Sequence, residues 1–329
     1  MRRCNAGTRP PIPRPGAARG KGSGRPRADR ADPARPCTEG DDRALAGKNS
    51  HTRREQEQPL LPVPARPPEP TIASLRDSPT EGDALARYWR FYWAVADAQL
   101  ARWLPRRPSR VLDISGDHGR CAERAAEAGH TVIEVRDPLL ERRTAGALAA
   151  GTACGGASGP GPATTKVFGD SGSLAFLGGA SMDAVLAENR VLSRHLATEE
   201  TIAEIARVLR PGGRVLLCVD SLTLGMALLA EQSHWAHLSD VPSAEVVLVP
   251  WPDGTITRCF GADQLRELLA EVGLEVSWIR PRTALSPSTV EHVLSSSPDA
   301  LPRLVRTELN APPGDESLGF HLLASAKRV

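Results

Sequence analysis

The sequence predicts an α/β protein in which a mostly parallel sheet carries helices on both faces. Residues 110–119 combine a short apolar strand, a turn of small residues and the start of an alanine-rich helix. Further apolar strand segments alternate with helical segments as far as residue 219. A Pro-Gly-Gly turn at 211–213 then separates an amphipathic helix from an apolar strand. This alternation is typical of a doubly wound sheet.

The first 80 residues differ from the rest of the chain in composition. They contain 16 Lys and Arg against 9 Asp and Glu, 14 of the 29 prolines and no aromatic residue. They therefore carry a charge of +7, which leaves 25 minus 30, or −5, for residues 81–329. Because such a segment buries too little apolar surface to offset its ordering entropy, we expect a disordered tail over 1–80 and a folded domain over 81–329. The alternative is an arm that contacts nucleic acid or an acidic partner.

Composition also limits the location and the partners of the protein. No apolar stretch approaches the roughly 18 residues that a membrane span requires, and the first 30 residues lack the apolar core of a secretory signal. The six cysteines form no Cys-x-x-Cys pair, which argues against a structural zinc site or a disulfide framework. The arginines of the tail have no aromatic neighbours for stacking on bases, which argues against nucleic-acid binding. We expect a cytoplasmic protein with reduced thiols and no bound metal.

The elements expected as far as residue 219 follow from apolar spacing. An aromatic-rich helix over 82–104 comes first, and its apolar face either packs on the domain or helps to close a pocket. A glycine- and alanine-rich segment at 151–165 is expected to be a flexible insertion. The other expected elements are strands 111–114, 131–135, 166–168, 182–187 and 215–219, with helices 120–129, 138–150 and 198–209.

The segments after residue 220 are expected to add lid or substrate insertions at 221–261 and 282–316. The first insertion contains a helix and a hairpin whose turn is Pro-Asp-Gly. The second insertion is helical. The expected elements are helices 222–238, 262–272 and 288–309, strands 245–249 and 255–260 of the hairpin, strand 274–279, and a closing strand 320–326.

Three motifs carry a resemblance to a known family. They are Asp113 with Gly119 around the first turn, Gly-Asp-Ser at 169–171 followed by Asp-Ala-Val at 183–185, and Ala-Arg-Val-Leu-Arg-Pro-Gly-Gly-Arg-Val at 206–215. With them, residues 83–329 resemble the class I S-adenosylmethionine-dependent methyltransferases of the type 11-like kind. The resemblance implies a Rossmann-like, seven-stranded, mostly parallel sheet with an antiparallel last strand. It also implies methylation of oxygen or nitrogen in a small molecule.

The resemblance assigns the first turn to the cofactor, S-adenosylmethionine. Asp113 occupies the acidic position of the motif, and Gly119 occupies its last glycine position. Ser115 and Asp117 stand where the family has its first two glycines, and Gly116 lies one place out of register. The strand, the turn and the N-terminus of the helix together direct backbone N–H groups at a ligand. The alternative is an ordinary turn between a strand and a helix that binds no ligand.

The other expected cofactor contacts come from later strand ends and the first helix. An acidic residue of the family accepts the ribose hydroxyls; Arg136 stands at that position here, and Asp137 follows it. Asp170 and the backbone of Ser171 match the residues that hold the adenine. Glu188 after the fourth strand and Tyr92 of the first helix complete the expected set of cofactor residues.

The catalytic residue is not identified by a motif. His195, which follows the fourth strand, is one candidate for a base near the reactive end of the cofactor, and His234 and His237 could reach the cleft from the lid. Two alternatives to a methyltransferase remain. One is a degenerate relative that binds or regulates without catalysis, and the other is a nicotinamide-dependent oxidoreductase, although the G-x-G-x-x-G fingerprint is absent.

Overall fold

The computed structural model describes residues 85–329 except 117–118, 139–163, 245, 252–253 and 312–318. All described residues belong to one compact unit. The expected tail, nearly all of the expected helix 138–150, most of the expected insertion 151–165 and Asp117 lie outside the described residues.

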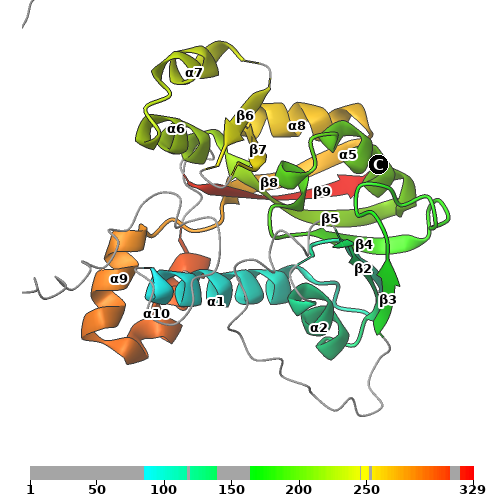
Figure 1. The fold of residues 1–329 in the computed structure, drawn as a ribbon. Coiled ribbons are helices and arrows are strands. Elements are labelled where there is room, and N and C mark those ends of the chain that lie inside the picture. The colour runs from blue at the N-terminus through cyan, green and yellow to red at the C-terminus, as the bar shows by residue number, and fades with distance from the viewer. Residues whose placement is uncertain (1–84, 117–118, 139–163, 245, 252–253, 312–318) are drawn as a thin grey trace, which may run out of the picture. The chain divides into compact units, whose positions relative to one another are not determined.

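One sheet forms the centre of this unit (Figure 1). The described residues supply it with nine strands: β1 (Arg110–Asp113), β2 (Thr131–Arg136), β3 (Thr164–Phe168), β4 (Met182–Ala187), β5 (Leu209–Ser221), β6 (Val247–Pro250), β7 (Ile256–Phe260), β8 (Leu274–Pro281) and β9 (His321–Arg328). Strands β3, β2, β1, β4 and β5 are parallel neighbours in that order, and β9 runs antiparallel between β5 and β8. These seven strands confirm the predicted sheet.

The β6–β7 hairpin adds two more strands to this sheet. It was expected as part of a lid, and it is antiparallel as predicted. β7 also pairs in parallel with the last two residues of β5, beyond the point where β4 ends. The hairpin therefore extends the sheet at the carboxyl end of β5.

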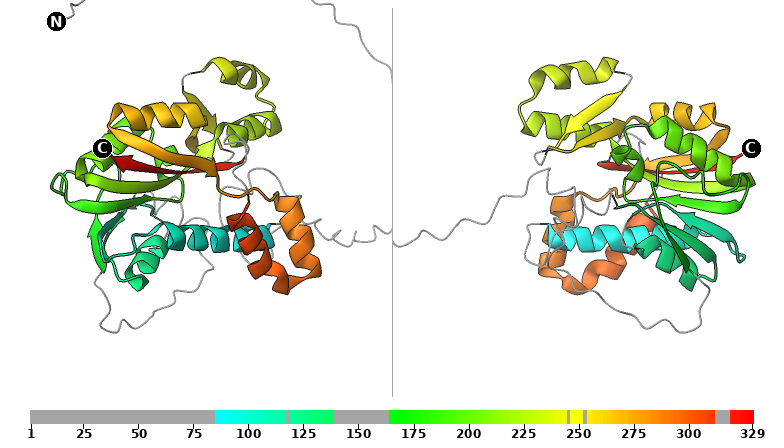
Figure 2. Two further views of the ribbon diagram at one scale, coloured as in Figure 1. Left: turned by 180° about the vertical axis from the view of Figure 1, so that it is seen from behind. Right: turned by 45° about the vertical axis from the view of Figure 1, so that its right-hand side comes forward.

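Helices cover both faces of the sheet, as Figure 2 shows from two further directions. The helices are α1 (Ala86–Trp103), α2 (Arg120–Glu127), α4 (Val191–Arg194), α5 (Thr198–Val208), α6 (Leu222–Glu231), α7 (Trp235–Asp240), α8 (Ala262–Glu271), α9 (Pro287–Ser296) and α10 (Leu301–Leu309). Apolar residues of α5 and α8 pack on one face, and those of α2 and the end of α1 pack on the other. This two-sided burial explains why the strands are almost continuously apolar.

The aromatic face of α1 packs on the second insertion. Tyr88, Phe91 and Val95 are at most 2% exposed and belong to one apolar cluster with residues of α9 and α10. Burial of one large side chain is worth about 1.5–3 kcal/mol, so this cluster fixes α1 against α9 and α10. The aromatic face of the first helix therefore packs on the domain.

Four predictions from the sequence are wrong. The expected helix 288–309 is two helices, α9 and α10, because Pro298 and Pro302 interrupt the backbone hydrogen bonds between them. The Pro-Gly-Gly turn lies inside β5, because Leu209 already pairs with Met182 before a register shift, and Gly212 takes up the bend with φ of 78°. The expected helix 222–238 is two helices, α6 and α7, which are separated at Ser233 with φ of 58°. Thr164 and Thr165 belong to β3 rather than to the flexible insertion, since they pair with β2.

Among the described residues, no helix combines the length and apolar character that crossing a membrane requires.

Candidate functional site

The turn after β1 is held to β4 by side-chain hydrogen bonds. The Asp113 carboxylate accepts the N–H of Ser115 at 2.9 Å. The Ser115 hydroxyl in turn accepts the N–H of Glu188 at 3.0 Å. Both carboxylate-bearing residues are buried. Ser115, which replaces a glycine of the expected motif, therefore fixes the turn at the carboxyl edge of the sheet.

Gly119 occupies a position that disfavours any side chain. Its φ of 87° lies in the left-handed region, and a Cβ there would lie 3.1 Å from Oε1 of Glu134. Glu134 cannot easily give way, because it is only 4% exposed and accepts a hydrogen bond from Arg136 at 2.9 Å. The glycine keeps the backbone close to the end of β2 at the start of α2.

The two residues at the end of β2 face different partners. Arg136, at the expected ribose position, pairs with Glu134 of its own strand. Asp137 is 1% exposed, and its Oδ2 accepts both the N–H of Ser171 at 3.1 Å and the Ser171 hydroxyl at 2.9 Å. The structure thus brings Asp137 and Ser171 together, and Asp137 already takes the N–H that was expected to meet the adenine.

His195 joins the same cluster. Its Nε2 lies 2.7 Å from Oγ of Ser171. Asp170 uses its Oδ1 to accept the N–H of Gly172 at 2.7 Å. Potential ligand atoms of Asp137, Asp170 and His195 all lie within 4.8 Å of one another. His195 therefore lies beside the residues expected to hold the nucleobase.

Glu188 forms a buried ion pair that the sequence did not predict. Its partner is Arg282, which follows β8 and is 1% exposed. Arg282 also donates to Oε1 of Gln99 at 2.9 Å, and its guanidinium lies 5.9 Å from the ring centre of Tyr92. Burial raises the pKa of Tyr92 well above its ordinary value, so the phenol stays protonated. Glu188 and Tyr92, both expected at the cofactor, therefore share one buried cluster through Arg282.

The sequence carried a weak signal for Arg282. It ends the run Arg-Pro-Arg at 280–282, directly after an expected strand on the sheet edge where ligands of such folds bind. Its burial depends on the packing of α1 over the sheet, which no local pattern contains.

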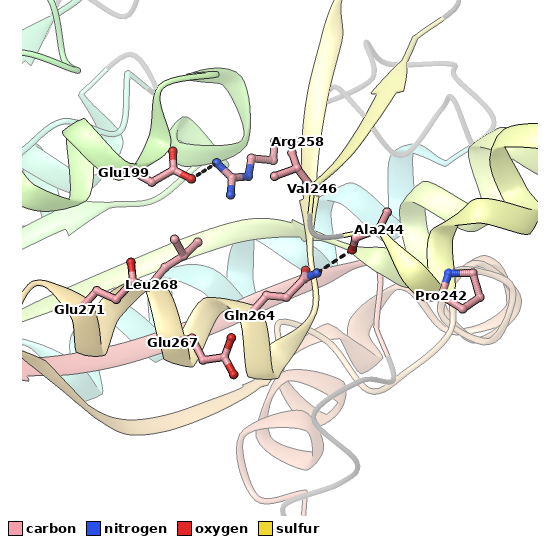
Figure 3. Close-up of a pocket in the computed structure, with 9 residues that line it drawn as sticks. All are labelled: Glu199, Pro242, Ala244, Val246, Arg258, Gln264, Glu267, Leu268 and Glu271. Carbon is pink, nitrogen blue, oxygen red and sulfur yellow. Dashed lines mark hydrogen bonds and ion pairs between the residues drawn. The ribbon is translucent and has the colours of Figure 1, made fainter. Parts of the chain in front are cut away.

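A separate groove of about 570 Å³ lies between α5, α8 and the hairpin (Figure 3). Glu199 and Arg258 form an ion pair of 2.7 Å across it, and Gln264 donates to the carbonyl of Ala244 at 3.2 Å. None of the expected cofactor residues that the structure describes lines this groove.

Comparison with known proteins identifies the family. A family model described as a methyltransferase domain matches residues 88–277, which is more than half of the chain. Among curated proteins, none matches this chain.

Several solved structures are similar in fold. One is a S-adenosylmethionine-dependent methyltransferase of Methanosarcina mazei, with 17% identity, coverage of 70% of this chain and 97% of that chain, and a TM-score of 0.45. Another is a 1,6-didemethyltoxoflavin-N1-methyltransferase of Burkholderia thailandensis with bound S-adenosylhomocysteine, with 21% identity, coverage of 74% and 81%, and a TM-score of 0.42. A third, a methyltransferase of Mesorhizobium loti, has 17% identity, coverage of 72% and 100%, and a TM-score of 0.43.

The residues at the carboxyl edge fit the cofactor of this family by their chemistry. S-adenosylmethionine presents a sulfonium, an ammonium, two ribose hydroxyls and an exocyclic amine, which are cations and hydrogen-bond donors. It also presents one carboxylate, for which the backbone N–H groups at the start of α2 are the matching donors. The ends of four neighbouring parallel strands present carboxylates, which are anions and acceptors: Asp113, Asp137, Asp170 and Glu188. The chain belongs to the methyltransferase domain family, and as a class I member it is an enzyme that uses S-adenosylmethionine.

Proposed function

We propose that the protein transfers the methyl group to oxygen or nitrogen of a small molecule. The observation that carries this proposal is the enclosure of the cluster at the ends of β4 and β5. Glu188, Arg190, Asp220 and Arg282 are each at most 5% exposed, and the ring of Tyr92 on α1 lies 5.9 Å from the guanidinium of Arg282. Because a macromolecule cannot bring a bulky segment to such a place, the enclosure favours a small acceptor.

We assign the cofactor to the carboxylates of the carboxyl edge. Asp113 and Ser115 hold the turn after β1 beneath the methionine part, and Glu188 accepts from its ammonium. Asp137 is the remaining carboxylate for the ribose, since Arg136 is engaged with Glu134. Asp170 and Ser171 take the adenine. Gly116 and Gly119 leave backbone space in the turn, and Tyr92 closes the pocket from α1.

The cofactor supplies an electrophilic methyl group. The protein orients the acceptor and excludes water from the site. The enclosed edge excludes water, so that the acceptor competes with no solvent nucleophile. The paired charges of Glu188 and Arg282 hold the cluster rigid, which favours an in-line approach of the acceptor.

The degenerate, non-catalytic alternative is favoured by the contact between Asp137 and Ser171, because a bound adenine must displace it. The methyltransferase and the non-catalytic alternative are tested by isothermal titration calorimetry, in which S-adenosylmethionine or S-adenosylhomocysteine is added to the purified full chain. We expect binding of both ligands. Absence of heat at about millimolar ligand, where the binding free energy is only about −4 kcal/mol, would remove the enzymatic assignment.

Asp137→Asn provides the matched comparison. The amide keeps the size of the side chain but removes the charge that holds the Ser171 N–H. If Asp137 receives the ribose, the variant binds S-adenosylhomocysteine more weakly. If Asp137 only blocks the adenine site, the variant binds more tightly.

A further inference from the structure

A second pair of buried polar residues lies at the same edge of the sheet. Asp220 is near the end of β5, and His321 begins β9. The two residues are direct partners in the antiparallel ladder, so their side chains lie on the same face. They are 2% and 3% exposed.

The atoms that face each other in this pair make no hydrogen bond within the described part of the chain. These atoms are Oδ1 of Asp220 and Nε2 of His321, and they lie 3.5 Å apart. Burial of polar atoms without a partner costs about 1–3 kcal/mol each, so such a pair calls for an explanation. The other carboxylate oxygen is fixed, because Oδ2 accepts from the Thr257 hydroxyl at 2.5 Å.

The pair adjoins the residues assigned to the cofactor. The ring of Tyr92 lies 5.5 Å from the ring of His321 and 5.9 Å from the guanidinium of Arg282, which binds Glu188. One aromatic ring thus contacts both His321 and the buried ion pair. His321 therefore lies at the same end of the site as Glu188, whereas His195 lies with Asp137 and Ser171.

The surroundings keep the imidazole of His321 neutral. Burial lowers its pKa well below the ordinary value, and the guanidinium groups of Arg190, Arg282 and Arg194 act in the same direction. Asp220 is the carboxylate that faces it, at 3.5 Å, and Arg190 lies 3.7 Å from the same carboxylate oxygen. A neutral imidazole has a lone pair that can accept a proton. Although the lowered pKa makes it a weaker base than a free histidine, the proton of the acceptor becomes more acidic as the acceptor atom bonds to the methyl carbon.

We propose that His321 is the general base that takes the proton of the methyl acceptor, and that Asp220 is the positioning residue for its imidazole. This proposal rests on the proposed function. Asp220 favours the tautomer that carries its hydrogen on Nε2, which leaves the lone pair on Nδ1. As the lone pair of the acceptor oxygen or nitrogen bonds to the methyl carbon, the carbon–sulfur bond breaks with its electrons on sulfur. The acceptor's O–H or N–H proton passes to Nδ1 of His321 and is later released to solvent.

The tautomer of His321 can be measured without knowledge of the acceptor. The full chain, labelled with ¹⁵N-histidine and saturated with S-adenosylhomocysteine, is examined by long-range ¹H–¹⁵N NMR at about pH 7.5, one unit above the ordinary histidine pKa. His321→Asn identifies the signal. We expect a neutral ring with hydrogen on Nε2, and a loss of that preference in Asp220→Asn. A charged ring, or hydrogen on Nδ1, would overturn the proposal.

Methyl transfer supplies the second test. Radiolabelled S-adenosylmethionine is offered with phenols, carboxylic acids, primary amines and thiols. We expect His321→Asn to lower the rate with a hydroxyl or amine acceptor about 10²- to 10⁴-fold without weakening S-adenosylhomocysteine binding. Asp220→Asn shifts the pH–rate profile, which a merely structural role would not do. The exposed His292 supplies the control, since His292→Asn retains the wild-type rate.

Thiol acceptors provide an internal check. A thiol is largely ionised at about pH 9, so its methylation does not need the base and should survive in His321→Asn. If that variant does not fold, His321→Gln replaces it. A variant that keeps more than a third of the wild-type rate with a hydroxyl or amine acceptor would overturn the proposal. If the wild-type protein methylates no acceptor of the panel, the NMR measurement of the His321 tautomer alone tests the proposal. Failure of the wild-type chain to bind S-adenosylhomocysteine would instead overturn the proposed function.

Discussion

His130, between α2 and β2, is expected to make the stability of this protein depend on pH. It is 1% exposed, and its two ring nitrogens have no hydrogen-bond partner among the described residues. Burial, and next the guanidinium of Arg214, hold its pKa below the ordinary value. The unfolded chain, with a histidine pKa of about 6.5, therefore binds the proton more readily than the folded chain does.

Stability should consequently fall as the pH drops below about 6.5, until the folded pKa is reached. His321 contributes with the same sign, because its pKa is lowered too. Replacement of His130 by Leu should make this decline shallower. The measurement is urea unfolding at several pH values between about 5 and 8. An unchanged slope in His130→Leu would show that the imidazole is not the cause.

Gly119 permits a comparison between strain and steric exclusion. Both Gly119 and Gly129 have φ near 87°, but a Cβ at Gly129 would meet nothing within 4 Å. Each Gly→Ala change should cost about 1–3 kcal/mol for the left-handed backbone. Only Gly119→Ala should also displace Glu134 and weaken S-adenosylhomocysteine binding. Equal losses of affinity in the two variants would mean that the first turn does not touch the cofactor.

At the scale of elements, the pairing of Glu188 with Arg282 joins the end of β4 to the segment after β8. Arg282→Met leaves the Glu188 carboxylate buried without this cation, which should cost about 3–5 kcal/mol of unfolding free energy. The surface pair of Arg210 and Asp183, with side chains 42% and 33% exposed, is the control.

Arg210→Met should cost only about 0–1 kcal/mol, because solvent screens the pair. Denaturant unfolding gives both values. The double variant Arg282→Met, Glu188→Leu should recover much of the loss, since it leaves no isolated charge in the interior. If the double variant is as unstable as Arg282→Met alone, the cost lies in packing rather than in charge.

At the scale of the whole molecule, the tail should be separable from the fold. The composition of residues 1–80 offers little apolar surface to bury, so their deletion should leave the melting temperature and the affinity for S-adenosylhomocysteine unchanged. Differential scanning calorimetry and ligand titration of the shortened chain are the measurements. A substantial drop in melting temperature would show that the tail contributes to the folded state.

The sequence predicted the sheet well because each strand and each turn has a local cause. β4 (Met182–Ala187) and the closing strand were found from apolar runs and breakers, whereas the antiparallel direction of the closing strand came from the family resemblance. The apolar spacing predicted a helix that includes Leu209, because local spacing contains no information about its pairing with Met182 on another strand. The contacts of Arg282 and His321 were not predicted for the same reason, because each joins residues more than ninety positions apart in the sequence.

The packing of α1 against α9 and α10 has a consequence for biosynthesis. The helix with the aromatic face leaves the ribosome early, but the helices that cover it are made nearly 200 residues later. At about 5–20 residues per second, the nascent chain carries this uncovered aromatic surface for roughly 10–40 s. Chaperones that bind apolar segments of nascent chains are therefore expected to bind this protein at α1.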